Sequence, residues 1–395
     1  MKLLVVDNAY ILRDKNGNFY SELIYDNLFF QRYLKVFDTV RFVAKVKEYN
    51  GDTRNLLPIN DVRVEICCLP AYQGMKGMIT SLYKTIPIYK NAGKDCDCFL
   101  FRIAQIESFF AYVLNSFRKK PFAIEVVNDP ETWDGTNIIF KLITCKIMKK
   151  MAKNANGSSY VTKEYLQKKY VSTATLKGES KEYFNSYYST IDLNVNSICK
   201  PKVFKKINTL KIIHVSNAIN SNIKGNKTVI EIVNKLNNDG FDCNVTFVGE
   251  GNMVEKYKDY VKFLKLEDKV FFIGRLAAKD DVLNIMKKSD LMIFPTHTEG
   301  LPRVIIEACA AGLPCLSTPV CGIPELISKA YLFEPEDING FVNKTKELIN
   351  NPNELTEMSI ANLKVAQLFV STVLEKRRTE FYLKLRSLAE SRNHE

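Results

Sequence analysis

The stretch that decides the fold runs from Pro295 to Ala308 and reads Pro-Thr-His-Thr-Glu-Gly-Leu-Pro-Arg-Val-Ile-Ile-Glu-Ala. It follows the apolar run Leu291–Phe294, which is typical of a buried strand. Pro302 marks the start of a helix, because a proline at the first helical position gives up no hydrogen bond. We therefore expect a strand, a loop that carries Glu299, and a helix, in that order.

This loop and the helix start form a candidate ligand site. Ligands of open α/β sheets lie at the carboxyl ends of the strands, where Glu299 is expected. Gly300 permits close approach of the backbone, and a helix start offers free N–H groups that suit a diphosphate. Glu307 falls about one and a half turns into the helix, where a carboxylate can bind vicinal hydroxyls. The segment can hold a nucleotide diphosphate sugar, although an ordinary strand–turn–helix with two exposed glutamates fits it too.

Outward from this segment, short β-branched runs alternate with helical stretches, which predicts an α/β protein with parallel sheets. The first series of strands is expected near Leu3–Val6, Thr39–Val46, Val62–Leu69, Cys98–Ile103 and Phe122–Val127. The second series is expected near Lys211–Val215, Val245–Val248, Val270–Ile273, Leu291–Phe294, Cys315–Ser317 and Tyr331–Phe333. The polar segment Ser197–Lys202 reads as a linker. We predict domains at 1–200 and 201–370, with a C-terminal helix at about 371–395 that packs back on the first.

Several segments in order resemble one family. Glu299–Ile327, with its EGLPRVIIEACAAGLP and GIPELI stretches, resembles the retaining family-four glycosyltransferases of the GT-B fold. Val248–Asn252 is similar to the family's strand-ending VGxG turn, and Val270–Gly274 to its VxFxG strand. Lys224-Gly225 resembles the KG pair after the first strand of the nucleotide domain. The resemblance covers roughly 210–333 and implies two Rossmann-like domains with parallel sheets facing across a cleft.

The resemblance also implies roles for residues of the second domain. Glu299 would bind hydroxyls of the donor sugar, Glu307 the ribose, and Lys224 the β-phosphate of the leaving group. The remaining donor-binding residues that it implies are Gly249, Arg275, Gly300, Leu301, Pro302 and Arg303. Stabilising the departing diphosphate is the main catalytic demand. In this family cationic side chains and a helix end meet that demand, so we expect no metal and no cofactor.

The chain departs from the family pattern in two places. The family often has an arginine a few residues before the KG lysine, whereas Val215–Ala218 contains none, and Arg275 or Arg303 could substitute for it. The amino domain usually offers a histidine near the sugar. In this chain Asn128 or Asp129 occupies that place.

We therefore predict that Asp129 is catalytic, with a plain turn aspartate as the alternative. Nearby Glu125 reads either as a functional group or as a core-facing carboxylate paired inside the sheet.

The net charge of +12 attracts anions in general. The segment Lys141–Lys153 can form a basic amphipathic helix. Its expected apolar stripe comprises Leu142, Ile143, Ile147 and Met151. Such a helix is either a domain helix with a solvated basic face or a dock for an anionic membrane surface. Arg118–Lys120 adds to the basic charge. No nucleic-acid module accompanies this charge, so we exclude nucleic acid as a partner.

Other patterns argue against metal and membrane-spanning segments. Asp95-Cys96-Asp97 has the form of a DxD metal motif, but it precedes a strand and reads as a solvated turn. The three histidines lack metal-binding spacing. His214 lies in an expected strand, whereas His297 could contact donor or acceptor. Ten cysteines without CxxC spacing, no long apolar run and a start that lacks a signal-peptide pattern predict a cytoplasmic protein.

Together these features predict a retaining glycosyltransferase that uses a nucleotide-sugar donor. The expected acceptor is a growing, lipid-linked saccharide of a capsule, O-antigen or exopolysaccharide, reached at the inner face of the membrane. Transfer by front-face attack follows from the resemblance alone. The alternatives are a GT-B epimerase or phosphorylase, and a non-catalytic nucleotide-sugar-binding subunit of a partner transferase.

Overall fold

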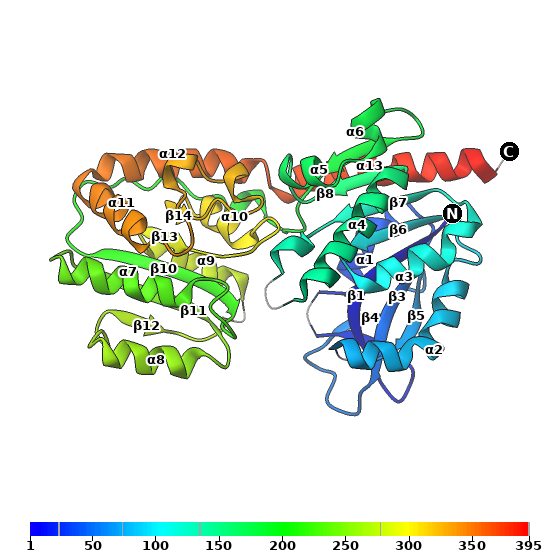
Figure 1. Ribbon diagram of the computed structural model, residues 1–395, viewed down its shortest axis with the longest axis horizontal. Helices are drawn as coiled ribbons and strands as arrows, with labels where there is room; N and C mark the ends of the chain where they lie inside the picture. Colours follow the sequence, from blue (N-terminus) through cyan, green and yellow to red (C-terminus); the bar gives the residue numbers. More distant parts are fainter. Residues whose placement is uncertain (23, 73, 134–135, 277, 394–395) are drawn as a thin grey trace. The chain divides into compact units, whose positions relative to one another are not determined.

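The computed structural model describes residues 1–22, 24–72, 74–133, 136–276 and 278–393 (Figure 1). The chain divides into two compact units. Unit 1 comprises Met1–Glu131, Asn137–Tyr188 and Glu375–Glu395, and unit 2 comprises Thr132–Thr136 and Ser189–Leu374. The segment that reads as a linker, 197–202, falls inside unit 2.

Unit 1 is built on a nine-stranded sheet. Its strands are β1 (Lys2–Arg13), β2 (Phe19–Ser21), β3 (Thr39–Glu48), β4 (Leu57–Ile59), β5 (Val64–Pro70), β6 (Cys98–Ile103), β7 (Phe122–Val126), β8 (Gly157–Tyr160) and β9 (Phe184–Tyr187). Seven are parallel in the order β5-β3-β1-β6-β7-β8-β9, and β2 and β4 add antiparallel pairs beside β1. The direction of strand addition reverses between β1 and β6, which is the switch point of a doubly wound sheet.

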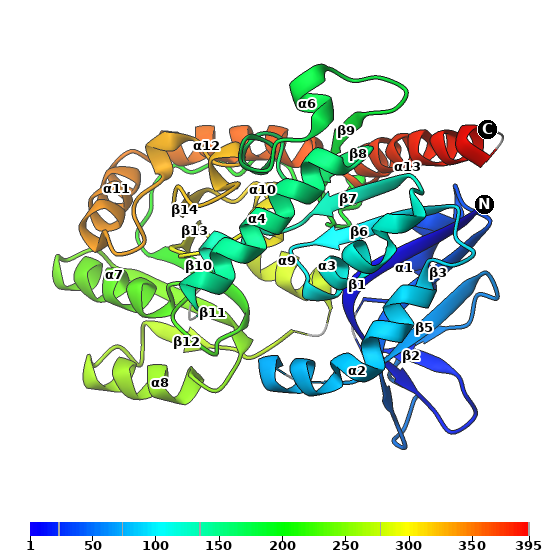
Figure 2. The same ribbon diagram turned by 45° about the vertical axis from the view of Figure 1, so that its right-hand side comes forward.

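The reversal also sorts the helices of unit 1 between the two faces of the sheet. They are α1 (Asn27–Leu34), α2 (Gly74–Ala92), α3 (Ile106–Asn115), α4 (Ile138–Asn154), α5 (Tyr165–Lys169), α6 (Thr173–Lys177) and most of α13 (Ser371–Asn393). Because parallel crossovers are right-handed, α2, α3 and α4 share one face, while α1 packs on the other. Figures 1 and 2 show α2, α3 and α4 side by side.

The C-terminal helix completes the core of unit 1. The ring of Tyr382 lies 5.3 Å from that of Tyr33, and Phe381 lies 5.3 Å from Phe184. Arg386 donates to Asp38 at 3.1 Å. These contacts tie residues near the end of the chain to α1, to the residue before β3, which lies 348 positions earlier, and to β9.

A row of buried charges crosses the sheet of unit 1 beneath this helix. Arg102 of β6 forms ion pairs with Asp7 of β1 at 2.5 Å and with Glu125 of β7 at 3.0 Å. Glu125 also accepts hydrogen bonds from Tyr188 at 2.9 Å and Tyr382 at 2.6 Å. Of the two readings for Glu125, the structure supports the paired carboxylate inside the sheet.

Unit 2 contains a five-stranded parallel sheet in the order β12-β11-β10-β13-β14. Its strands are β10 (Leu210–Ala218), β11 (Cys243–Glu250), β12 (Val270–Phe272), β13 (Leu291–Phe294) and β14 (Cys315–Ser317). Its helices are α7 (Asn226–Asn238), α8 (Val254–Phe263), α9 (Lys279–Lys288), α10 (Arg303–Ala310), α11 (Ile338–Asn350) and α12 (Pro352–Gln367). The expected strand at Tyr331–Phe333 is wrong: a single parallel bridge joins Leu332 to Ser317, and a 3₁₀ turn precedes it.

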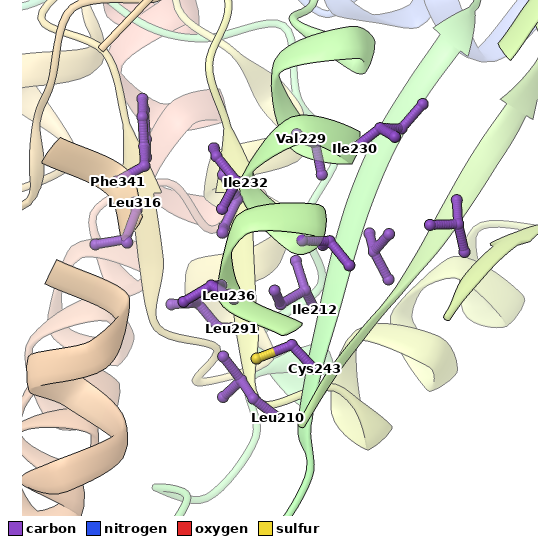
Figure 3. Close-up of a cluster of buried hydrophobic side chains, with 14 of the residues drawn as sticks. Leu210, Ile212, Val229, Ile230, Ile232, Leu236, Cys243, Leu291, Leu316 and Phe341 are labelled. Atoms are coloured by element: carbon purple, nitrogen blue, oxygen red, sulfur yellow. The ribbon is translucent and has the colours of Figure 1, made fainter. Parts of the chain in front are cut away.

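The core of unit 2 forms where α7 covers the sheet (Figure 3). α7 buries Val229, Ile232, Val233 and Leu236, at the spacing of one helical face. Figure 3 shows Leu236 close to Leu210, Cys243 and Leu291 of three strands. Each such side chain contributes about 1.5–3 kcal/mol by leaving water. This packing fixes the strand ends from which the loops described next emerge.

Candidate functional site

Two loops meet at the switch point of unit 2, at the carboxyl ends of the paired strands β10 and β13. Lys224 lies in the loop after β10, and Glu299 lies in the loop after β13. The Lys224 ammonium forms an ion pair with the Glu299 carboxylate and donates to the Thr298 carbonyl at 3.1 Å. Both side chains are half-buried. The structure therefore brings together these two predicted catalytic residues from segments 75 positions apart.

Gly225 explains how Lys224 is held. Its φ of +76° lies in the left-handed region, and a Cβ there would stand 2.3 Å from the Pro295 carbonyl oxygen. The same loop is anchored by Ile223, whose carbonyl accepts from the His297 amide at 2.8 Å and the Thr296 hydroxyl at 3.2 Å. Only a glycine lets the two loops approach this closely.

Two further glycines bring neighbouring strand ends together. Gly249 has φ +141°, and a Cβ there would lie 1.7 Å from the Ser216 carbonyl oxygen. Its amide donates to the Gly274 carbonyl at 2.9 Å. The VGxG turn and the glycine of the VxFxG strand thus join the ends of β10, β11 and β12. Gly249 packs behind Ser216, which itself faces the pocket.

A pocket of about 790 Å³ opens at these loop ends, within unit 2. Ligand pockets commonly have volumes of about 300–1,000 Å³. Among its lining residues are six of the predicted site residues, Lys224, Arg275, Glu299, Pro302, Arg303 and Glu307. Leu283 and Met286 of α9 and Phe294 of β13 supply apolar wall. Three cationic side chains, Lys224, Arg275 and Arg303, therefore line one cavity with an apolar wall.

The N-terminus of α10 also faces this pocket. Pro302 occupies the cap position, no side chain caps the helix, and Arg303 and Val304 line the cavity. The uncapped amide groups and the positive end of the helix favour a bound anion. Glu307 follows on the same helix and also lines the pocket.

Gly300 and Leu301 hold the loop. Leu301 is buried, and the Gly300 carbonyl accepts from the Gly322 amide at 3.0 Å. The Thr318 hydroxyl donates to the Thr296 carbonyl at 2.8 Å from the same neighbouring segment. The GIPELI stretch thus supports the site loop from behind, a function that its sequence did not reveal.

The two histidines near this site have different surroundings. His214 is fully buried between Phe247 and Phe294, and its Nδ1 lies 3.0 Å from the Ile293 carbonyl oxygen. Burial lowers the pKa of His214 to about 4, so the ring is neutral at pH 7. His297 lies 3.3 Å from Glu336 and outside the set of residues that line the pocket.

Asp129, the predicted catalytic residue of the amino domain, lies in unit 1 and is fully buried. Its carboxylate accepts from Tyr170 at 2.6 Å, from Tyr165 at 2.7 Å and from the Lys169 ammonium at 2.6 Å. Burial raises the pKa of Asp129, but hydrogen bonds from Lys169, Tyr170 and Tyr165 outweigh it and hold the pKa below its ordinary value. The carboxylate is therefore held by side chains of α5 (Tyr165–Lys169) and of Tyr170, the residue that follows it.

The DxD segment has structural partners. Asp95 pairs with Arg41 at 2.9 Å, and Asp97 accepts from the Lys2 amide at 2.7 Å. Among the described residues, no three metal-ligating side chains are grouped in a way that could hold an ion.

The expected stripe of the basic helix is wrong. In α4, Met151 is fully buried whereas Leu142 and Ile143 are more than half exposed. The buried face of α4 runs instead through Cys145, Met148 and Met151. No helix in the described part of the chain is long and apolar enough to cross a membrane.

The comparisons with known proteins agree with this geometry. Residues 200–365 match the family described as glycosyl transferases group 1. Protein CapJ of Staphylococcus aureus is 26% identical over 400 residues, which cover 97% of this chain and 98% of CapJ.

Two solved structures share the architecture. Anabaena Alr3699/HepE, in complex with UDP and glucose, has a TM-score of 0.63 at 16% identity and covers 96% of this chain and 98% of its own. The lipopolysaccharide outer core galactosyltransferase WaaB in its apo form has a TM-score of 0.66 at 13% identity, with 99% and 100% covered. The chain therefore has the GT-B fold and is a glycosyltransferase that resembles the retaining family-four enzymes.

Proposed function

We propose that the protein transfers a sugar from a nucleotide-sugar donor to a saccharide acceptor during assembly of a surface polysaccharide, with retention at the anomeric carbon. The observation that carries the donor site is the Lys224–Glu299 pair beside the uncapped N-terminus of α10, in a pocket of about 790 Å³. A relative in the GT-B fold, HepE, binds UDP and glucose. A capsule, O-antigen or exopolysaccharide is the proposed product class.

The proposed donor-site roles follow from charge and position. The diphosphate would lie at the start of α10, where the backbone N–H groups of Gly300, Leu301 and Arg303 meet the dipole end. Lys224 would leave Glu299 and neutralise the β-phosphate, while Glu299 would accept from sugar hydroxyls. Glu307 would bind the ribose, and Arg275 would lie near the base.

In the proposed reaction the bond between the anomeric carbon and the β-phosphate oxygen breaks, and the bond to the acceptor oxygen forms on the same face. The departing phosphate takes the proton of the acceptor hydroxyl. Lys224, Arg303 and the end of α10 would carry the leaving-group charge without a metal ion, since preorganised cations are the strongest catalytic aid to charge separation.

We further propose that unit 1 binds the acceptor at the carboxyl edge of its own sheet, near the switch point between β1 and β6. In this proposal Asp129 positions Lys169 and does not contact the substrate, because hydrogen bonds enclose its carboxylate. We also propose a lipid-linked acceptor at the cytoplasmic face of the membrane; WaaB, which has the same fold, is named as a lipopolysaccharide outer core galactosyltransferase.

A thermal-shift panel of nucleotides and nucleotide sugars, run with magnesium and with EDTA, tests the donor proposal. A ligand that binds only the folded state raises Tm. We expect one nucleotide class to stabilise the protein in both buffers and to stabilise Glu307→Gln less. Products of the preferred donor and a saccharide primer would then be analysed for anomeric configuration. A panel without any shift would contradict the proposal.

A second candidate is a nucleotide-sugar-binding subunit without its own activity. The observation that favours it is the absence of the family arginine. Ser216, Asn217 and Ala218 line the pocket in its place and carry no positive charge. Strong donor stabilisation without transfer or hydrolysis of any donor would support this candidate instead.

A further inference from the structure

One face of unit 1 carries an unusual concentration of basic and apolar side chains. α2 contains three lysines and α4 contains five, and neither helix contains a carboxylate. Every other described helix of ten residues or more has at least one. The single carboxylate of α3, Glu107, is buried and paired with Lys45 at 2.8 Å, so it does not neutralise the surface.

The three helices form one continuous surface. The Asn115 amide of α3 donates to the Tyr89 carbonyl of α2 at 2.8 Å, and the Asn154 amide of α4 donates to the Tyr112 hydroxyl of α3 at 3.0 Å. Figure 2 shows α2, α3 and α4 side by side. We call this surface, with Arg118–Lys120 beyond α3, the basic helical face.

Apolar side chains project from the same face. On α4 the exposed positions recur at helical spacing, apolar in the first two turns and basic after them. The apolar ones are Ile138, Ile139, Leu142 and Ile143, and the basic ones are Lys146, Lys149, Lys150 and Lys153. On α2, Tyr83 is 71% exposed and Ile79 58%, between Lys76 and Lys84. Phe117 beyond α3 is 59% exposed.

These charges are not compensated locally. Within the described part of the chain, no lysine of α2 or α4 forms an ion pair. On the opposite face, α13 forms ion pairs through three of its cations, Arg386 with Glu390, Lys384 with Glu179 and Arg392 with Glu182. Cations without ion-pair partners, interleaved with exposed apolar side chains, are the chemistry that recognises an anionic lipid surface.

We infer that the basic helical face docks unit 1 on an anionic lipid bilayer, with the lysines on the headgroups and the first turns of α4 in the interface. Since α4 follows β7, its apolar turns lie at the carboxyl edge of the sheet. That edge is the proposed acceptor side of unit 1. Docking therefore adds to the proposed function, and the choice of a lipid-linked acceptor rests on that function. A protein docked there would meet its acceptor in the membrane plane.

The test measures binding of the full chain to sedimented vesicles of phosphatidylcholine alone and of an equal mixture with phosphatidylglycerol. We expect binding to the mixed vesicles only. A variant with Lys146→Gln, Lys149→Gln, Lys150→Gln and Lys153→Gln should bind roughly two to three orders of magnitude more weakly. Its matched control removes the same charge from exposed lysines of unit 2, through Lys256→Gln, Lys262→Gln, Lys287→Gln and Lys288→Gln, and should bind like the wild type.

A Leu142→Gln, Ile143→Gln variant separates insertion of the apolar side chains into the bilayer from electrostatic attraction of the lysines to the headgroups. It should keep binding at low salt and lose the fraction that resists high salt, because only the apolar contact survives screening.

Several results would overturn docking: no binding to mixed vesicles, equal binding to neutral vesicles, equal losses in the two lysine variants, or preference for an oligonucleotide over vesicles. Nucleotide thermal shifts on the same preparations keep the two proposals apart. A nucleotide shift without vesicle binding overturns docking alone, and vesicle binding without a nucleotide shift overturns the donor site alone.

Discussion

Replacing Gly225 by alanine tests how the candidate site is assembled. Gly225 and Gly240 flank α7, and both have left-handed backbone, with φ +76° and +85°. A Cβ on Gly225 would lie 2.3 Å from the Pro295 carbonyl oxygen, whereas a Cβ on Gly240 would meet nothing within 4 Å. The pair separates the cost of the backbone conformation from the cost of the close approach.

The expected magnitudes follow from this difference. Either alanine in left-handed backbone costs about 1 kcal/mol. The overlap at Gly225 adds about 1–3 kcal/mol, the usual cost of forcing atoms into a packed site. At this domain size 1 kcal/mol lowers Tm by about 2–4 °C. The decrease in Tm caused by Gly225→Ala should therefore be about two to four times the decrease caused by Gly240→Ala.

The assay is differential scanning calorimetry of both variants with and without the stabilising nucleotide. Gly225→Ala should also lose nucleotide stabilisation, because relief of the overlap moves Lys224 away from Glu299, while Gly240→Ala should keep it. Equal losses of Tm, or an unchanged nucleotide shift in Gly225→Ala, would refute the view that this glycine sets the position of Lys224.

Three further outcomes are expected. Lys224→Gln should reduce the initial transfer rate by about 10²–10³ while Tm without ligand stays within a few degrees; a rate within threefold of wild type would remove Lys224 from the leaving-group role. The pKa of about 4 for folded His214 lies below its unfolded value of about 6.5. Between these two pH values the unfolded chain binds more protons than the folded chain. The free energy of unfolding should therefore fall by about 1.4 kcal/mol per pH unit from pH 6.5 towards pH 4. His214→Gln should lack this slope in urea titrations across that range. Tyr382→Phe removes a 2.6 Å hydrogen bond to buried Glu125 and should cost about 1–3 kcal/mol in urea unfolding, whereas exposed Tyr83→Phe should cost almost nothing.

The sequence predicted the five strands of unit 2 because glycines and apolar runs mark them, although β10 and β11 continue to Ala218 and Glu250, beyond the predicted ends at Val215 and Val248. Gly225 and Gly249 stand where backbones approach closely, and β10, β11, β13 and β14 are mostly buried runs. It missed β8 and β9, whose sequences GSSY and FNSY are short and polar and become strands only by adding to β7. A propensity argument cannot find strands that their neighbours create.

The error in α4 has a different origin. Its first two turns are apolar except for Lys141 and Thr144, so periodicity could not decide which stripe is buried. Packing decided in favour of Met148 and Met151, and this choice left Leu142 and Ile143 exposed. Likewise, the bonds of Asp129 to Lys169 and Tyr170 span about 40 residues and follow no readable motif.

The pairing of Tyr382 with Glu125 has a consequence for the order in which the protein folds during synthesis. Unit 2 is nearly continuous in the chain, but unit 1 is complete only when residues 375–393 have emerged. At 5–20 residues per second the ribosome needs roughly 10–40 s to travel from the end of β9 to Tyr382. During that time Glu125 lacks one of its two tyrosine donors, and the surface around Tyr33 and Phe184 lacks its cover. The last helix thus acts as a closing element, and a nascent chain released before it appears would leave unit 1 open to chaperones and proteases.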